Sequence, residues 1–146
     1  MARAQRDGAS VAAVTFDIDY FKRINDEWGH DSGDDVLVRL GEVFRDATRE
    51  GDVVARVGGE EFTALLWGSD REQAHAYAER IRAAFAKSEL GIGPLTISAG
   101  IACAQPPDLE VERLLHEADS ALYAAKAAGR DRSVGFESAQ TSLLAR

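Results

Sequence analysis

Val11-Ala-Ala-Val-Thr-Phe-Asp-Ile-Asp19 is the stretch that decides the fold, because an apolar, β-branched run ends there in two carboxylates. The run from Val11 to Phe16 predicts a strand that is buried on both faces. A carboxylate that completes a buried strand must find a partner, and a strand end holds a ligand for a hard cation rigidly. Asp17 is therefore a candidate metal ligand. For Asp19, a cap on the following helix is an equally good interpretation.

The segments that follow alternate between helical and extended patterns. Apolar residues at i, i+3 and i+4 predict helices over residues 34–49, 71–85 and 110–128, the last one ending at Gly129. Short apolar runs predict strands over residues 52–57, 62–67, 95–103 and 133–136, and the first two of these form a hairpin whose glycines adopt positive φ. This order predicts an α+β fold of the ferredoxin-like or palm-like kind, with helices packed on a mostly antiparallel sheet.

The bulk composition narrows the class of protein. A chain of 146 residues is expected to form one domain. Its net charge of −8 disfavours nucleic acid as a partner, because phosphate backbones are bound mainly through Lys and Arg. The single cysteine, Cys103, excludes an internal disulfide. Without a run of transmembrane length or a leader pattern, we expect a cytoplasmic location and no membrane contact for this fragment.

Further polar clusters carry candidate chemistry. In Gly58-Gly59-Glu60-Glu61, two acidic side chains share a tight turn and repel each other unless a cation lies near; a solvated β-turn is the alternative. In residues 29–34, a helix start offers free backbone N–H groups, and Asn25 and Asp34 offer groups that suit a guanine edge. Asp34 as a plain N-cap and His30 as a surface histidine remain open alternatives.

Two basic residues stand near the end of the last predicted helix. Lys126 and Arg130 are four residues apart and project from one side if the helix reaches that far, where they would hold a triphosphate. Basic residues that suit the dipole of a helix C-terminus are the alternative.

Four segments together resemble the GGDEF domains, the diguanylate cyclases. Residues 58–62 match the GGEEF form of the name motif, and residues 17–34 match D-x-D-x-F-K-x-x-N-D…G-H-x-x-G-D without a gap. Residues 96–102 are similar to T-x-S-x-G-I-A, and residues 118–130 to A-D-x-A-L-Y-x-A-K-x-x-G-R. The resemblance implies a nucleotidyl cyclase fold of the palm-like kind and covers nearly the whole chain from Val11 onward.

The resemblance also implies a role for each matching residue. Asp17, the carbonyl of Ile18 and Glu60 would bind two Mg²⁺ or Mn²⁺ ions per GTP site, with Glu61 assisting. One of the two glutamates would accept the proton of an attacking 3′-hydroxyl. The groups expected to contact the nucleotide are Asn25, His30 and Asp34 at guanine, and Lys22, Gly58, Gly59, Lys126 and Arg130 at the phosphates.

An inhibitory site is also expected from the resemblance. Arg49-Glu50-Gly51-Asp52 resembles the R-x-x-D site of the family, where bound product suppresses turnover, and Arg80 would add a second basic contact. A helix end followed by a turn is the alternative interpretation. Family domains begin with D-x-L-T-x-L-x-N-R and a first helix, whereas residues 1–5 look like the tail of that helix. We therefore expect residues 1–146 to form a single GGDEF domain without its first helix and upstream sensory region.

Three functions follow as hypotheses. The first is a diguanylate cyclase that works as a homodimer, joining one GTP from each copy into cyclic di-GMP. The second is a receptor that binds GTP or cyclic di-GMP without making product. The third is a structural or dimerisation domain. Asp17, Glu60 and Glu61 favour the enzyme, because a pure receptor does not need metal-binding carboxylates.

Overall fold

The computed structural model describes residues 9–137, so the helix tail expected at residues 1–5 lies outside the described residues. The chain runs through β1 (Val11–Ile18), α2 (Phe21–Trp28), α3 (His30–Ala47), β2 (Val53–Arg56), β3 (Glu61–Trp67), α4 (Arg71–Ala86), β4 (Ile97–Ala104), α5 (Val111–Ala127) and β5 (Ser133–Gly135). The predicted order of helices and strands is confirmed, and α2 is an additional short helix that apolar periodicity did not indicate.

The strands form one sheet in the order β2-β3-β1-β4-β5. β1 lies in the centre, antiparallel to both β3 and β4, and β2 is antiparallel to β3. The pairing of β4 with β5 is parallel. All eight residues of β1 are buried, which confirms that its unbroken apolar run marks a strand covered on both faces. The predicted mostly antiparallel sheet is therefore confirmed.

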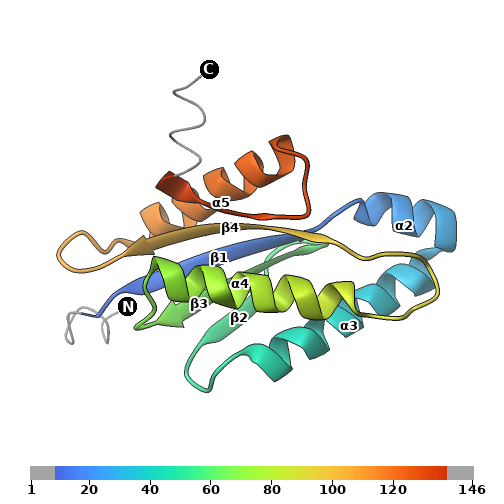
Figure 1. Ribbon diagram of the computed structural model, residues 1–146, viewed down its shortest axis with the longest axis horizontal. Coiled ribbons are helices and arrows are strands. Elements are labelled where there is room, and N and C mark those ends of the chain that lie inside the picture. The colour runs from blue at the N-terminus through green and yellow to red at the C-terminus, as the bar shows by residue number, and fades with distance from the viewer. Residues whose placement is uncertain (1–8, 138–146) are drawn as a thin grey trace.

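Helices cover both faces of this sheet (Figure 1). On one face the larger core packs α3 and α4 against the sheet around Phe16, whose ring meets Phe44 and Tyr77 edge to face. On the other face, α5 packs on Val11, Ala13 and Ala102. Even-numbered residues of β1 thus face one core and Val11 and Ala13 the other, as the alternation of side chains along a strand requires.

The contact between α5 and β4 depends on one glycine. A Cβ atom on Gly100 would lie 2.2 Å from the carbonyl oxygen of Ala118 and 2.2 Å from the backbone nitrogen of Leu122. The helix backbone therefore rests directly on the strand. This close approach fixes the position of the C-terminal end of α5, where Lys126 lies.

The predicted start of the helix over residues 34–49, which is α3 in the structure, was wrong. Gly29, with φ 89°, ends α2 and serves as the N-cap of α3, so α3 begins at His30 instead of residue 34. Asp34 consequently lies inside the helix and is not its N-cap. Along residues 9–137, no helix combines the length and the apolar character needed to cross a membrane.

Candidate active site

The carboxylate of Asp17 stands at the end of the central strand. Asp17 pairs in register with Glu61 of β3 on one side and Ser98 of β4 on the other, and it is 6% exposed. Its Oδ2 lies 2.5 Å from the Nζ of Lys126. The partner that a buried carboxylate requires is therefore a lysine brought in by α5.

The hairpin glutamates lie at the same edge of the sheet. The N–H of Ile18 donates to the carbonyl of Glu60 at 3.3 Å, and Glu61 is the cross-strand neighbour of Asp17. Burial raises the pKa of Glu61, and the charges of Asp17, Asp119 and Glu60 raise it further, whereas Lys126 lowers it. As predicted, the hairpin lies beside Asp17: Glu61 is its neighbour in register, and the backbone of Glu60 is bonded to the next residue, Ile18. Asp119 is an acidic neighbour of Glu61 that sequence reasoning missed.

This acidic edge suits a hard cation by its chemistry. Carboxylate and carbonyl oxygens are the ligands that Mg²⁺ prefers. Burial is the main cause that raises the pKa of Glu61, and the neighbouring carboxylates of Asp17, Asp119 and Glu60 add to it, so a cation bound here would stabilise the ionised form. The side chains are not arranged as a finished cage, since no three His, Cys, Asp or Glu residues among those described converge on one point. Lys126 supplies the positive charge beside Asp17.

Asp19 has a different role from Asp17. Its carboxylate accepts hydrogen bonds from Thr96 Oγ1 at 2.8 Å, from Ser98 Oγ at 2.6 Å and from the backbone N–H of Asp131 at 3.0 Å. The suggestion that it caps the next helix was wrong, because the N-cap of α2 is Tyr20. Asp19 instead ties the end of β1 to the β4 side of the sheet and to the turn after α5.

The glycines of the hairpin tip also differ from expectation. Gly58 and Gly59 do not belong to the described residues with positive φ, so the predicted requirement was wrong. The turn is held by Arg56, whose Nε donates to the carbonyls of both glycines at 3.1 Å and whose Nη2 donates to Gly59 at 2.7 Å. A side chain outside the motif therefore fixes the tip.

The residues expected at guanine lie on α2 and α3. A Cβ on Gly33 would fall 1.8 Å from Asn25 Oδ1, so the Asn25 amide occupies the space that this glycine leaves open. Asp34 follows Gly33 on α3 and is exposed, as are His30 at the start of α3 and Lys22 on α2. Asn25 and the start of α3 are thus brought together, and Gly33 is the residue that allows it.

Lys126 and Arg130 do not share a helix face. α5 ends at Ala127, and hydrogen bonds from Gly129 N to Lys126 O and from Arg130 N to Ala125 O close it in a Schellman motif. Gly129, with φ 122°, lies one residue past the C-cap Ala128, so the helix terminates where the sequence indicated. Arg130 lies beyond the helix, and its guanidinium carbon is 5.0 Å from the centre of the Tyr20 ring.

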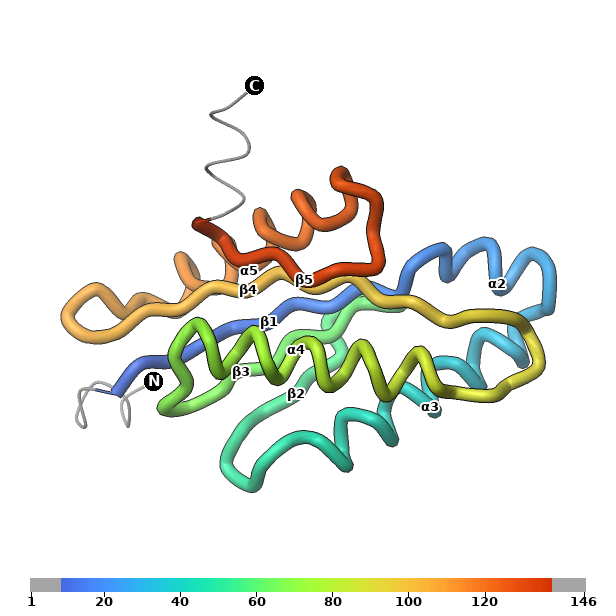
Figure 2. The backbone as a smooth tube through the Cα atoms, in the orientation of Figure 1, coloured from blue at the N-terminus to red at the C-terminus, as the bar shows by residue number. Residues whose placement is uncertain are grey.

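Figure 2 shows why these groups meet: the turn after α5 returns to the end of the sheet from which α2 departs. The carboxylate edge, the turn after α5 and the start of α2 therefore belong to one corner of the molecule. We call this corner, formed by Asp17, Glu60, Glu61, Lys126 and Arg130, the charged corner.

The residues expected to form an inhibitory site lie close together in the structure. Arg49 donates to Asp52 Oδ2 at 2.9 Å, to the Trp67 carbonyl at 3.1 Å and to Ser69 Oγ at 3.3 Å, and Asp52 also accepts from the Trp67 N–H at 3.1 Å. The Asp52 side chain is 5% exposed and that of Arg49 is 62% exposed. Both residues line a cavity of about 240 Å³ together with Arg80 of α4.

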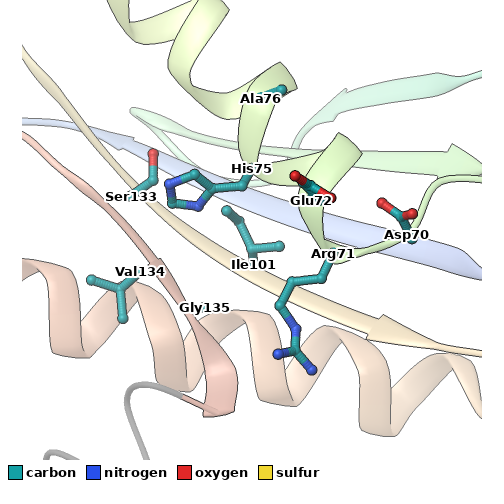
Figure 3. A pocket seen from close by; sticks show the side chains of 9 residues that line it. All are labelled: Asp70, Arg71, Glu72, His75, Ala76, Ile101, Ser133, Val134 and Gly135. Carbon is teal, nitrogen blue, oxygen red and sulfur yellow. The ribbon is translucent and has the colours of Figure 1, made fainter.

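A larger cavity lies elsewhere among the described residues. It measures about 830 Å³ and lies between the N-terminal half of α4 and the strands β4 and β5 (Figure 3). Its lining includes His75, Ile101 and Ser133 but none of the residues predicted to act on a nucleotide. The convergence of charged groups therefore favours the charged corner over this larger cavity as the candidate site.

Comparison with known proteins agrees with this geometry. The family model described as "Diguanylate cyclase, GGDEF domain" matches residues 1–132. The chain belongs to the GGDEF domain family. Diguanylate cyclase DgcP of Pseudomonas aeruginosa is 43% identical over 136 residues, which are 90% of this chain and 20% of that protein. Diguanylate cyclase DosC of Escherichia coli is 39% identical over 138 residues, 90% of this chain and 30% of that protein.

Solved GGDEF domains have the same fold. The GGDEF domain of DgcB from Caulobacter crescentus, solved in complex with c-di-GMP, superposes with a TM-score of 0.88 at 31% identity, covering 93% of this chain and 83% of that one. The active GGEEF domain of a diguanylate cyclase from Vibrio cholerae superposes with a TM-score of 0.87 at 36% identity, covering 92% and 88%. The predicted palm-like α+β fold is thus confirmed, and this chain spans less than a third of the two curated relatives named above.

Proposed function

We propose that this GGDEF domain is the catalytic unit of a diguanylate cyclase, which condenses two GTP molecules into cyclic di-GMP and releases pyrophosphate. The observation that supports it best is the meeting of Asp17, Glu60 and Glu61 at one sheet edge, beside Lys126. A receptor or a structural domain would not require such a concentration of carboxylates, and the relatives at 39–43% identity are named diguanylate cyclases.

In this proposal the chain holds and orients the reactants. Asp17, the Ile18 carbonyl and Glu60, assisted by Glu61, would hold Mg²⁺ or Mn²⁺, two ions per GTP site. Bound there, the ions would supply charge neutralisation at the phosphates and help to ionise the attacking hydroxyl. Glu60 or Glu61 takes the proton from the 3′-hydroxyl as it attacks the α-phosphate of the second GTP.

The remaining residues bind the nucleotide. Asn25 and Asp34 read the guanine edge near His30, and Gly58 and Gly59 leave the hairpin backbone accessible to the triphosphate. The cations that contact phosphate oxygens are Lys22, Lys126 and Arg130. Each domain holds one GTP, so two copies must face each other, and the fixed alignment of both nucleotides supplies much of the catalysis.

Turnover by a tethered dimer tests this function. Two copies joined through a coiled-coil tag on a long flexible linker, incubated with GTP and Mg²⁺, should yield cyclic di-GMP by chromatography. Glu60→Ala should lower the rate at least about a hundredfold, since a lost metal ligand removes several kcal/mol of transition-state stabilisation. Glu89→Ala, at an exposed position after α4, is the matched control. Tight binding of cyclic di-GMP without any turnover would favour the receptor instead.

The same domain is proposed to be inhibited by its product. The cavity that Arg49 and Arg80 share offers two guanidinium groups of the kind that pair with phosphate or guanine, and DgcB was solved with c-di-GMP bound. Arg80→Gln should weaken the binding of cyclic di-GMP about tenfold or more by calorimetry. Arg45→Gln, an exposed arginine of α3, should leave it unchanged. Equal affinities for both variants would place the product elsewhere.

A further inference from the structure

Tyr20 has an unusual backbone for its residue type. It is the N-cap of α2 with φ 58° and ψ 33°, the left-handed region, yet within residues 9–137 its side chain makes no capping hydrogen bond. The residue is 51% exposed and lies beside Arg130 of the charged corner. A left-handed tyrosine costs free energy that the surrounding structure must offset, and such residues collect at functional sites.

Two guanidinium groups lie over the Tyr20 ring. The guanidinium carbon of Arg23 is 4.5 Å from the ring centre, and that of Arg130 is 5.0 Å away. Arg23 is three residues further along, so helix geometry alone brings it there. Arg130 is distant in sequence and belongs to the turn after α5, which Asp19 holds in place by accepting a hydrogen bond from the N–H of Asp131.

The contact leaves the donors of Arg130 available. In the part of the chain that the structure describes, no hydrogen bond from the Arg130 side chain is found, whereas the ammonium of Lys126 is held by Asp17. When a guanidinium lies over an aromatic ring, the ring contacts the flat face of the guanidinium. The N–H groups point outward in the plane of the guanidinium and remain free to bind a phosphate in a bidentate manner.

We propose that Tyr20 is a positioning residue, which holds the Arg130 guanidinium ready for a phosphate group of GTP. This rests on the proposed function, in which Arg130 binds a phosphate. A preset arginine loses less side-chain entropy when the nucleotide arrives, so the ring contributes to affinity without touching the substrate.

Nucleotide affinity measures this contribution. The whole chain is titrated with a non-hydrolysable GTP analogue in the presence of Mg²⁺. Tyr20→Phe keeps the ring and should bind as the parent does. Tyr20→Asn removes the ring but tolerates the left-handed backbone, and should bind roughly two- to fivefold more weakly, the range of an exposed cation–π contact. Matching thermal melts of the two variants exclude a folding defect.

A double-mutant cycle identifies the partner of the ring. In an Arg130→Gln background, Tyr20→Asn should cause no further loss, whereas in an Arg23→Gln background the loss should persist. A full loss in the Arg130→Gln background would mean that the ring contacts the nucleotide itself, and would overturn the proposal. A loss cancelled by Arg23→Gln would also overturn it. A parent chain that binds no GTP analogue would reject the proposed function together with this inference, which separates the two failures.

Discussion

At the scale of single residues, Asp19 contributes more to the stability of the fold than its place in the motif suggests. Its buried carboxylate collects three donors from the β4 side and from the turn after α5. In Asp19→Asn, the amide keeps one acceptor oxygen but sets its NH₂ against groups that donate. We expect a loss of about 2 kcal/mol in the free energy of unfolding, measured with urea. Asp35→Asn, at an exposed position on α3, should change it by less than about 0.5 kcal/mol.

Cys103 offers a second test on one side chain. Burial raises the pKa of its thiol to about 11 from an ordinary 9.0. Because the thiolate is disfavoured in the fold, this contribution to stability is present below the ordinary pKa and is lost as pH rises through about 11. At pH 8, alkylation should be at least about tenfold slower in the native protein than in urea, since thiolate is the reactive form. Equal rates in both states would show that the thiol is exposed and ionises normally.

At the scale of elements, the packing of α5 on β4 depends on Gly100. Gly100→Ala places a Cβ 2.2 Å from helix backbone, so α5 must move away from the sheet and take Lys126 with it. We expect a loss of about 3 kcal/mol in unfolding free energy, the upper range for overpacking. Gly41→Ala is the matched control in α3, where a Cβ meets nothing within 4 Å, and should gain about 0.5–1 kcal/mol. A Gly100→Ala variant as stable as the parent would contradict this packing.

Sequence patterns predicted the elements better than their ends. The apolar run of β1 and the apolar stripe of α5 were sufficient to predict a strand and a helix, because burial of a strand or of one helix face directly determines which positions are apolar. The start of α3 was misplaced because Gly29 both ends α2 and caps α3, and a single glycine does not reveal both roles. Lys126 and Arg130 were expected on one side only if the helix extended to Arg130, and that condition is not met because α5 ends at Ala127 in a Schellman turn.

The sequence likewise predicted part of the candidate site, namely its acidic residues, and missed others. Asp17, Glu60 and Glu61 were expected together; the antiparallel register of β1 and β3 pairs Asp17 with Glu61, and a backbone hydrogen bond holds Glu60 beside Ile18. Tyr20 and Asp119 were missed because their roles arise from contacts across the fold, which no local pattern encodes. Arg56 was missed although its contacts with Gly58 and Gly59 are local, because they depend on the path of the turn backbone.

At the scale of the whole molecule, the proposed chemistry divides one reaction between two copies. Without a tag, specific activity should rise with protein concentration, because only paired domains hold both nucleotides. Cyclic di-GMP production is measured across a dilution series, with the tethered dimer as the control whose specific activity stays constant. Activity per molecule that is independent of concentration in the untagged protein, together with a monomeric mass by light scattering, would contradict the two-copy mechanism.

The place where the chain enters the sheet determines where a tether can attach relative to the candidate site. Ser10 is fastened to the turn before α4, through its Oγ to the Ser69 carbonyl at 2.9 Å and through its own carbonyl to the Gly68 N–H at 2.7 Å. The rest of β1 separates this point from Asp17 by about 20 Å. A short rigid tether attached at residue 9 would therefore hold each copy at the end of the sheet opposite to Asp17. We expect the two candidate sites to face each other only when the linker is long enough to span this separation in both copies.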